Sequence, residues 1–226
     1  MTSYEIEIKS LLGSEEKAQE LKQRLTKLDP TLKLLSQNKQ LNHYFVDGDV
    51  QILYASLARF LAPEEQERLK EIVSLGSDFS IRTRLINDER LIFVIKASQD
   101  EGISHNAVSR LEFEVEVKGM TQEVLDQLLL DAGFRYQAKW SREREEYRCA
   151  DINVCLDKNA GYGYLAEFEK VVENETQIQQ AREELKKAMD ELGAEELPQE
   201  RLERMFAYYN EHWPEYYGTN KVFTVE

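Results

Sequence analysis

Charged residues recur at every second position in five short segments of the chain. The first segment is Glu5-Ile6-Glu7-Ile8-Lys9, and the others lie within residues 80–84, 110–116, 141–148 and 167–169. Because successive side chains of a β-strand point to opposite faces, each segment predicts a strand with a charged face. A chain built from such strands is expected to form a mainly antiparallel sheet.

The charged faces consist almost entirely of glutamate and arginine, and like charges stand two residues apart. These sets are Glu5 with Glu7, Glu112 with Glu114 and Glu116, Glu167 with Glu169, Arg82 with Arg84, and Arg142 with Arg144. Side chains at this spacing lie about 7 Å from each other on one face, so like charges repel. A solvent-facing strand accounts for any one of these sets, but their repetition favours faces that bind ligands.

The residue types indicate which ligands these would be. Mg²⁺ and Mn²⁺ prefer oxygen ligands, so a cation offsets the repulsion within a pair of carboxylates. Arginine binds phosphate oxygens bidentately, so a phosphate offsets the repulsion within a pair of arginines. If helices cover the apolar faces, the charged faces surround a shared interior. The pattern therefore predicts a site for a nucleotide or a polyphosphate.

Helical patterns separate the strands, and turn residues mark where the helices begin and end. A second strand is expected at residues 42–46, and the tail from residue 215 is expected to be a loop or an edge strand. We expect helices from Ser14 to Asp29-Pro30, within residues 51–75 with a break near Pro63, from Thr121 to Gly133, from Asn174 to Leu192, and from Pro198 to near Trp213-Pro214.

No stretch rich in Gly, Ser or Pro divides the 226 residues, so we expect a single α+β domain over residues 1–226. Within it, residues 47–79 predict a helical insertion and residues 174–213 predict C-terminal helices. The insertion could be a lid, a dimer contact or surface decoration.

Composition limits the function further. The net charge of −14 argues against binding of nucleic acid through overall charge. Cys149 and Cys155 have no metal-ligand spacing and predict reduced thiols. Since the chain shows no signal peptide and no apolar run of about 20 residues, it is expected to be cytoplasmic and not to bind membranes.

The order of the charged residues resembles that of the CYTH superfamily, also called the triphosphate tunnel metalloenzymes. Glu5-x-Glu7-x-Lys9 is similar to the ExExK signature of this superfamily, which includes class IV adenylyl cyclases, thiamine triphosphatases and inorganic triphosphatases. The likeness continues to about residue 170 through Tyr44-Phe45, Arg82-x-Arg84, Lys96, Arg110-x-Glu112-x-Glu114, Arg142-x-Arg144-x-x-Tyr147, Asp157, Gly163 and Glu167-x-Glu169.

The resemblance implies a closed, eight-stranded antiparallel β-tunnel (a barrel) with helices packed outside it, and a homodimer is common among similar proteins. It implies one or two Mg²⁺ or Mn²⁺ ions bound by Glu5, Glu7, Glu167 and Glu169, with Glu112, Glu114 and Asp157 as further candidates. It implies phosphate binding by Lys9, Arg82, Arg84, Lys96, Arg142 and Arg144, with Arg110 as an addition. Among these, Lys9, Lys96 and Arg142 are the candidates for catalysis.

We therefore expect a metal-dependent enzyme that hydrolyses inorganic triphosphate, thiamine triphosphate or a nucleoside triphosphate. Hydrolysis needs fewer dedicated parts than cyclisation, and the sequence shows no adenine-binding pocket. Three alternatives stay open. They are a class IV adenylyl cyclase that converts ATP to cyclic AMP and pyrophosphate, a non-catalytic module that binds polyphosphate or a nucleotide, and a structural protein whose charges pair internally.

Overall fold

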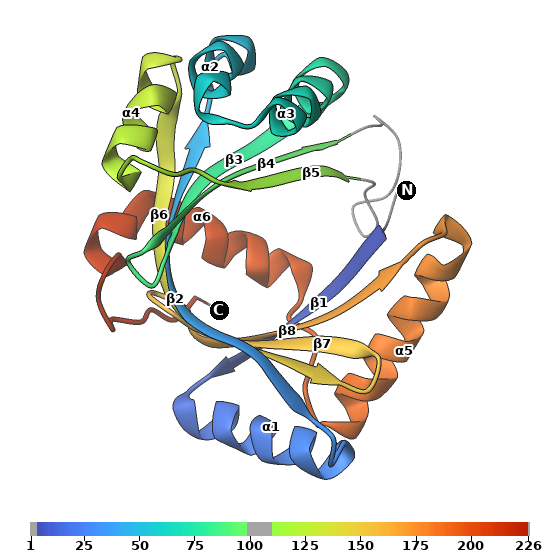
Figure 1. The fold of residues 1–226 in the computed structure, drawn as a ribbon. Coiled ribbons are helices and arrows are strands. Elements are labelled where there is room, and N and C mark those ends of the chain that lie inside the picture. The colour runs from blue at the N-terminus through green and yellow to red at the C-terminus, as the bar shows by residue number, and fades with distance from the viewer. Residues whose placement is uncertain (1–3, 99–109, 226) are drawn as a thin grey trace. The chain divides into compact units, whose positions relative to one another are not determined.

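The computed structural model describes residues 4–98 and 110–225, which form eight β-strands and six α-helices (Figure 1). The strands are β1 (Tyr4–Gly13), β2 (Lys33–Val46), β3 (Ser77–Ile86), β4 (Arg90–Ser98), β5 (Arg110–Glu116), β6 (Arg135–Cys149), β7 (Ile152–Asn159) and β8 (Gly163–Val172). The helices are α1 (Glu15–Leu28), α2 (Val50–Leu57), α3 (Pro63–Leu75), α4 (Gln122–Asp131), α5 (Ile178–Glu191) and α6 (Gln199–Tyr216). Short 3₁₀ turns follow α2 (Ala58–Phe60) and precede α5 (Glu175–Gln177).

The eight strands form one sheet in the order β1-β8-β7-β6-β2-β3-β4-β5. The register is defined for β1 with β8, β2 with β3, β3 with β4, β4 with β5, β6 with β7, and β7 with β8, and each of these pairs is antiparallel. This confirms the α+β class with an eight-stranded antiparallel sheet. β1 and β5 stand at the two ends of the strand order, and no pairing between them occurs in the described residues, so closure of the sheet stays a prediction.

The chain divides into two compact units. The described residues of the first unit are 4–39 and 141–225, and those of the second unit are 40–98 and 110–140. The first part of β2 and the last part of β6 belong to the first unit, and the remainder of both strands belongs to the second. Each unit has its own hydrophobic core.

In the first unit, α1 and α5 cover the apolar face of β1, β8 and β7 (Figure 1). Ile6 and Ile8 of β1 and Phe168 of β8 are buried against these helices. α1 begins at the predicted cap, where the Lys17 backbone N–H donates to Ser14 Oγ at 3.4 Å. Burial of the isoleucines fixes the register, because a slip of one residue would expose them and bury the charged residues between them.

In the second unit, α2, α3 and α4 pack on the apolar face of β3, β4 and β5 (Figure 1). Phe93 and Ile95 of β4 and Phe113 of β5 are fully buried there. α3 begins at Pro63, as the sequence predicts, because proline suits the first turn of a helix. α4 is capped by Thr121, whose Oγ1 accepts from the Val124 N–H at 3.4 Å.

Several elements differ from their predicted bounds, among them β2 and α6. β2 begins at Lys33, well before the predicted start at Asn42. The sequence does not indicate the early part of this strand, because it is largely polar and shows no apolar alternation. α6 continues through Pro214 to Tyr216. The tail after it forms only an isolated bridge between Val222 and Gly161, so the expected loop is confirmed for most of this segment.

No helix in the described part of the chain is long and apolar enough to span a membrane. Cys149 and Cys155 are both buried and form no disulfide, which agrees with the prediction of free thiols.

Candidate functional site

The first unit gathers seven predicted site residues on one face of the sheet, and we call this set the first-unit face. Cross-strand register places Lys9 opposite Glu167, Glu7 opposite Glu169, and Arg144 opposite Asp157. Register partners in an antiparallel pair share a face. The full set is Glu7 and Lys9 of β1, Arg142 and Arg144 of β6, Asp157 of β7, and Glu167 and Glu169 of β8.

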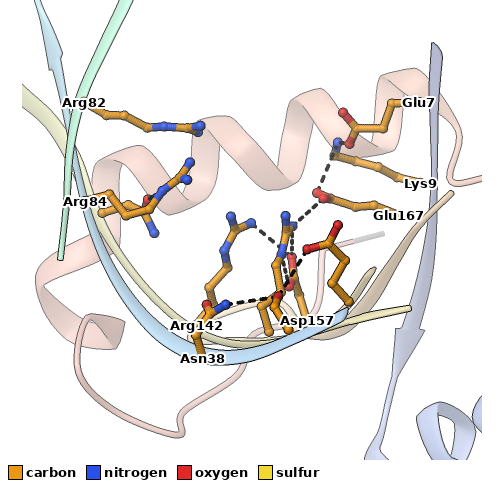
Figure 2. A network of polar contacts seen from close by, with 12 residues as sticks. Glu7, Lys9, Asn38, Arg82, Arg84, Arg142, Asp157 and Glu167 are labelled. Carbon is orange, nitrogen blue, oxygen red and sulfur yellow. Dashed lines mark hydrogen bonds and ion pairs between the residues drawn. The ribbon is translucent and has the colours of Figure 1, made fainter. Parts of the chain in front are cut away.

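Ion pairs connect the strands across this face, as Figure 2 shows. Lys9 Nζ contacts the carboxylate of Glu7 and lies 3.3 Å from Glu167 Oε1. The other oxygen of Glu167 contacts Arg144 Nη2. Arg144 Nη2 also donates to Asp157 Oδ2 at 2.6 Å. Acidic and basic side chains therefore neutralise one another along the face in the protein alone.

Asp157 is the most enclosed group of this network, with its side chain only 1% exposed. Arg144 donates to it twice, from Nε to Oδ1 at 2.7 Å and from Nη2 to Oδ2 at 2.6 Å. Arg142 Nη1 donates to Oδ2 at 3.0 Å. The Arg142 and Arg144 side chains stay 15% and 17% exposed. One buried carboxylate thus fixes two guanidinium groups that remain open to solvent.

The ionisation of Glu167 reflects its position between cations. Burial alone would raise the pKa of the Glu167 carboxyl. The positive charges of Lys9, Arg144 and Arg142 outweigh burial and hold this pKa well below its ordinary value. Glu167 is therefore a carboxylate at neutral pH, as a cation ligand has to be.

One row of the first-unit face offers three oxygen-bearing side chains to a divalent cation, beside Glu167 in the next row. Glu7, Glu169 and Asn153 are successive register partners on β1, β8 and β7. The Oδ1 atom of Asn153 is buried and has no hydrogen-bond partner in the described structure. Carboxylate and amide oxygens are the hard ligands that Mg²⁺ and Mn²⁺ prefer, so this row fits such a cation. Among the described side chains, however, no three His, Cys, Asp or Glu residues are already grouped as a metal site.

In the second unit, Arg82 and Arg84 of β3 each bond to a polar residue of β2. Arg82 Nη1 donates to the Tyr44 hydroxyl at 2.9 Å, and Arg84 Nε donates to Asn42 Oδ1 at 3.0 Å. These residues are also the register partners of the two arginines. Arg84 Nη1 lies 3.5 Å from the Glu114 carboxylate. The β2 strand therefore orients both guanidinium groups.

The remaining predicted residues are less fully defined. Lys96 stands in register with Ser80 and with Glu112 of β5. The side chains of Glu5, Arg110 and Glu112 lie outside the described part of the structure, and their roles stay predictions. On β4, the register partners of Arg82 and Arg84 are the buried residues Val94 and Ile92, so this strand contributes apolar side chains where its neighbour contributes arginines.

His43 lies on the face of β2 opposite to Asn42 and Tyr44. Its Nδ1 is 2.6 Å from Asp126 Oδ2 on α4, and both side chains are buried. His43 therefore belongs to the packing of α4 on the sheet and not to the charged face.

Three residues near the predicted site residues were not predicted from the sequence: Asn42, Tyr44 and Asn153, of which Tyr44 lies within a segment of the family resemblance. None of the three carries a charge, so the period-two pattern of ionised residues passes over them. The one available signal is parity, because Asn42 and Tyr44 alternate with the apolar-facing residues of β2. Cys155 is also on this face, between Glu146 and Glu167. Burial raises the pKa of its thiol to about 12, so it is neutral at physiological pH.

Residues 73–201, more than half of the chain, match a model of the CYTH domain family. The chain belongs to the CYTH domain family, which confirms the resemblance seen in the sequence. No curated protein matches the chain.

Solved structures share the fold at low sequence identity. The PH1012 protein of Pyrococcus horikoshii OT3 is 19% identical, with a TM-score of 0.58, and the match covers 87% of this chain and 92% of that protein. An adenylate cyclase candidate from Vibrio parahaemolyticus is 12% identical, with a TM-score of 0.58 and coverage of 92% and 99%. The adenylyl cyclase candidate HpAC1 from Hippeastrum, whose structure is described as revealing a dominant triphosphatase activity, is 18% identical, with a TM-score of 0.51 and coverage of 90% and 96%.

Proposed function

We propose that this protein hydrolyses a triphosphate in a reaction that depends on Mg²⁺ or Mn²⁺, with the first-unit face as its centre. The observation that carries the proposal is the network of Lys9, Glu167, Arg144 and Asp157, which alternates acid and base on one face of the sheet. The closed tunnel implied by the resemblance, with Arg82, Arg84 and Lys96 as further phosphate ligands, is part of the proposal.

Stability alone is a poor reason for such a network. Removing charges from water costs several kcal/mol per ion in rough terms, and well-packed apolar residues often stabilise a core as well as ion pairs do. Charged groups kept at this cost are characteristic of sites where charge has a chemical use. The partial exposure of Arg142 and Arg144 supports such a use, because a ligand can reach them.

The side chains divide the work of phosphoryl transfer between them. A bound divalent cation supplies neutralisation of phosphate oxygens, and Glu7, Glu167 and Glu169 would hold it, with Glu5, Glu112 and Glu114 as predicted additions. Arg142 and Arg144 would bind phosphate oxygens and stabilise charge that develops on the transferred group. Lys9 lies between the carboxylates and would place a positive charge at the junction of cation and phosphate.

A screen that resolves products tests the proposal. Purified protein is incubated with tripolyphosphate, thiamine triphosphate or ATP, with Mg²⁺ or Mn²⁺ or with EDTA. We expect orthophosphate from at least one substrate, only with metal, and a loss of about 100-fold or more in kcat/KM for Glu7→Gln. Glu191→Gln is the matched control, since Glu191 is an exposed glutamate at the end of α5. It should behave as wild type.

Other outcomes identify the alternatives. Cyclic AMP and pyrophosphate from ATP, without orthophosphate, would identify a class IV adenylyl cyclase. Tight binding of tripolyphosphate without any product would indicate a non-catalytic module. A protein that binds no triphosphate, and in which Glu7→Gln changes only stability, would be structural.

A further inference from the structure

We infer that Asp157 is a positioning residue that holds Arg142 and Arg144 for a phosphate chain, and that it is not a ligand of the divalent cation. This inference rests on the proposed function and deepens it. It gives Asp157 a role different from the cation ligand that the family resemblance implies.

Asp157 accepts three hydrogen bonds from the two arginines. Oδ1 accepts from Arg144 Nε at 2.7 Å, and Oδ2 accepts from Arg144 Nη2 at 2.6 Å and from Arg142 Nη1 at 3.0 Å. Both carboxylate oxygens are therefore engaged by guanidinium groups. With the side chain only 1% exposed, little of either oxygen remains open to a third partner.

The groups in contact with Asp157 are positively charged. A divalent cation on Asp157 would lie beside two guanidinium groups, whose positive charges repel it at short range in a partly buried site. Arginine keeps its proton at any physiological pH, so this repulsion cannot be relieved by deprotonation. The same two positive charges attract a phosphate oxygen. The electrostatics near Asp157 thus favour an anion.

The strand register separates Asp157 from the carboxylates of β1 and β8. Its register partner on β8 is Leu165, and the partner of Leu165 on β1 is Leu11. No carboxylate of β1 or β8 therefore stands in the row of Asp157. The row of Glu7, Glu169 and Asn153 is separated from it by the row of Lys9, Glu167 and Cys155.

The buried carboxylate of Asp157 also explains how Arg142 and Arg144 keep one orientation. A free arginine side chain carries much rotational entropy, and a bidentate pair with a fixed carboxylate removes it before a ligand arrives. The two arginine side chains remain 15% and 17% exposed, so a ligand can still reach them. Asp157 thereby contributes to phosphate binding without touching the phosphate.

Two binding measurements on intact protein separate the roles. Mn²⁺ binding is followed by electron paramagnetic resonance without any phosphate, and tripolyphosphate binding is followed by calorimetry in EDTA. We expect Asp157→Asn to leave the Kd for Mn²⁺ within about twofold of wild type and to raise the Kd for tripolyphosphate about tenfold or more. Glu169→Gln, on the same face, should weaken Mn²⁺ binding and should not weaken tripolyphosphate binding.

A double-mutant cycle tests whether Asp157 acts through Arg144. In an Arg144→Gln background, Asp157→Asn should raise the Kd for tripolyphosphate by clearly less than it does alone, because the group that Asp157 positions is already absent. The double variant removes a buried charge together with its partner. If Asp157→Asn alone leaves the arginines uncompensated and the protein unfolded, Mn²⁺ binding is measured on the double variant with Arg144→Gln as its reference, and the two Kd values should agree within about twofold. Asp157→Glu, which keeps the charge, should recover part of the tripolyphosphate affinity.

Loss of Mn²⁺ binding in Asp157→Asn, with tripolyphosphate affinity unchanged, would overturn the inference and leave the proposed function intact. Additive effects of Asp157→Asn and Arg144→Gln would also overturn it. If wild-type protein binds neither Mn²⁺ nor tripolyphosphate, the proposed function fails first and the inference fails with it.

Discussion

At the scale of single residues, Glu167 shows how the charged face stays stable without a ligand. Its two oxygens contact Lys9 from β1 and Arg144 from β6. These positive charges hold the pKa of Glu167 low, although burial opposes them. The carboxylate that a cation would use is thus already paired with the groups that a phosphate would use.

This pairing predicts a dependence of stability on pH. Because the pKa of Glu167 is lower in the folded protein, its contribution to stability is complete above the unfolded value of about 4.3 and is lost as pH falls through the folded value. At pH 7, Glu167→Gln should lower the free energy of unfolding by about 1–3 kcal/mol. Below about pH 4 the difference from wild type should narrow. Urea unfolding at a series of pH values measures it.

Glu20→Gln is the control for this experiment. Glu20 lies on α1, is 62% exposed and pairs with Arg24 at 3.5 Å. Exposed pairs of this kind contribute about 0–1 kcal/mol, so this variant should stay close to wild type at every pH. A Glu167→Gln protein that is as stable as wild type at pH 7 would contradict the assigned role of the pair.

At the scale of secondary-structure elements, one buried carboxylate joins α4 to three strands of the second unit. Asp126 lies 2.6 Å from His43 Nδ1 of β2 and accepts from Thr83 Oγ1 of β3 at 2.7 Å. It also accepts from the Tyr136 hydroxyl of β6 at 2.8 Å. Gln122 Nε2 extends the cluster by donating to Thr83 Oγ1 at 3.2 Å. This cluster fixes α4 on the face opposite the arginines of β3.

Asp126→Ala should therefore destabilise the second unit by about 2–4 kcal/mol, because the buried His43 and Thr83 and the half-buried Tyr136 lose their common partner. Hydrogen exchange of the α4 backbone amides, read together with urea unfolding, measures the effect where it arises. Thr83→Val removes one donor to Asp126 and should cost about 1 kcal/mol. Equal protection of α4 in Asp126→Ala and wild type would show that the cluster does not anchor this helix.

The elements also show what sequence can and cannot predict. Strands such as β1 and β8 were predictable because charged and apolar residues alternate over part of each strand, at residues 5–9 and 167–169. The first part of β2 was not, because residues 36–40 are polar throughout and its identity as a strand depends on pairing with β6. The partner of Asp126 was likewise hidden, since His43 lies 83 residues away and no local pattern links them.

The same limit applies to the site. Period two places Arg142 and Arg144 on one charged face, and the family resemblance adds Asp157, but neither reveals that one carboxylate binds both arginines. That contact depends on the register between β6 and β7, which aligns Arg144 with Asp157. Neutral residues such as Asn42 and Asn153 escape a search based on charge, although both stand in register with predicted site residues.

At the scale of the whole molecule, the net charge of −14 limits how a triphosphate could be attracted to the protein. A protein with this charge repels a triphosphate at a distance, so attraction has to come from local arginines and lysines and from a bound cation. Each unit carries a charged sheet face behind a separate apolar core. Membership of the CYTH domain family connects these features to a triphosphate ligand in the proposed function.

The most direct measurement of the central claim is a crystal structure of the protein with Mn²⁺ and imidotriphosphate, a slowly hydrolysed analogue of tripolyphosphate, with the metal located by its anomalous scattering. We expect Mn²⁺ on the carboxylates of Glu7, Glu167 and Glu169, and phosphate oxygens on Lys9, Arg142 and Arg144. An analogue bound elsewhere at saturating concentration, with the ion pairs of Lys9, Glu167 and Arg144 unchanged, would contradict this proposal.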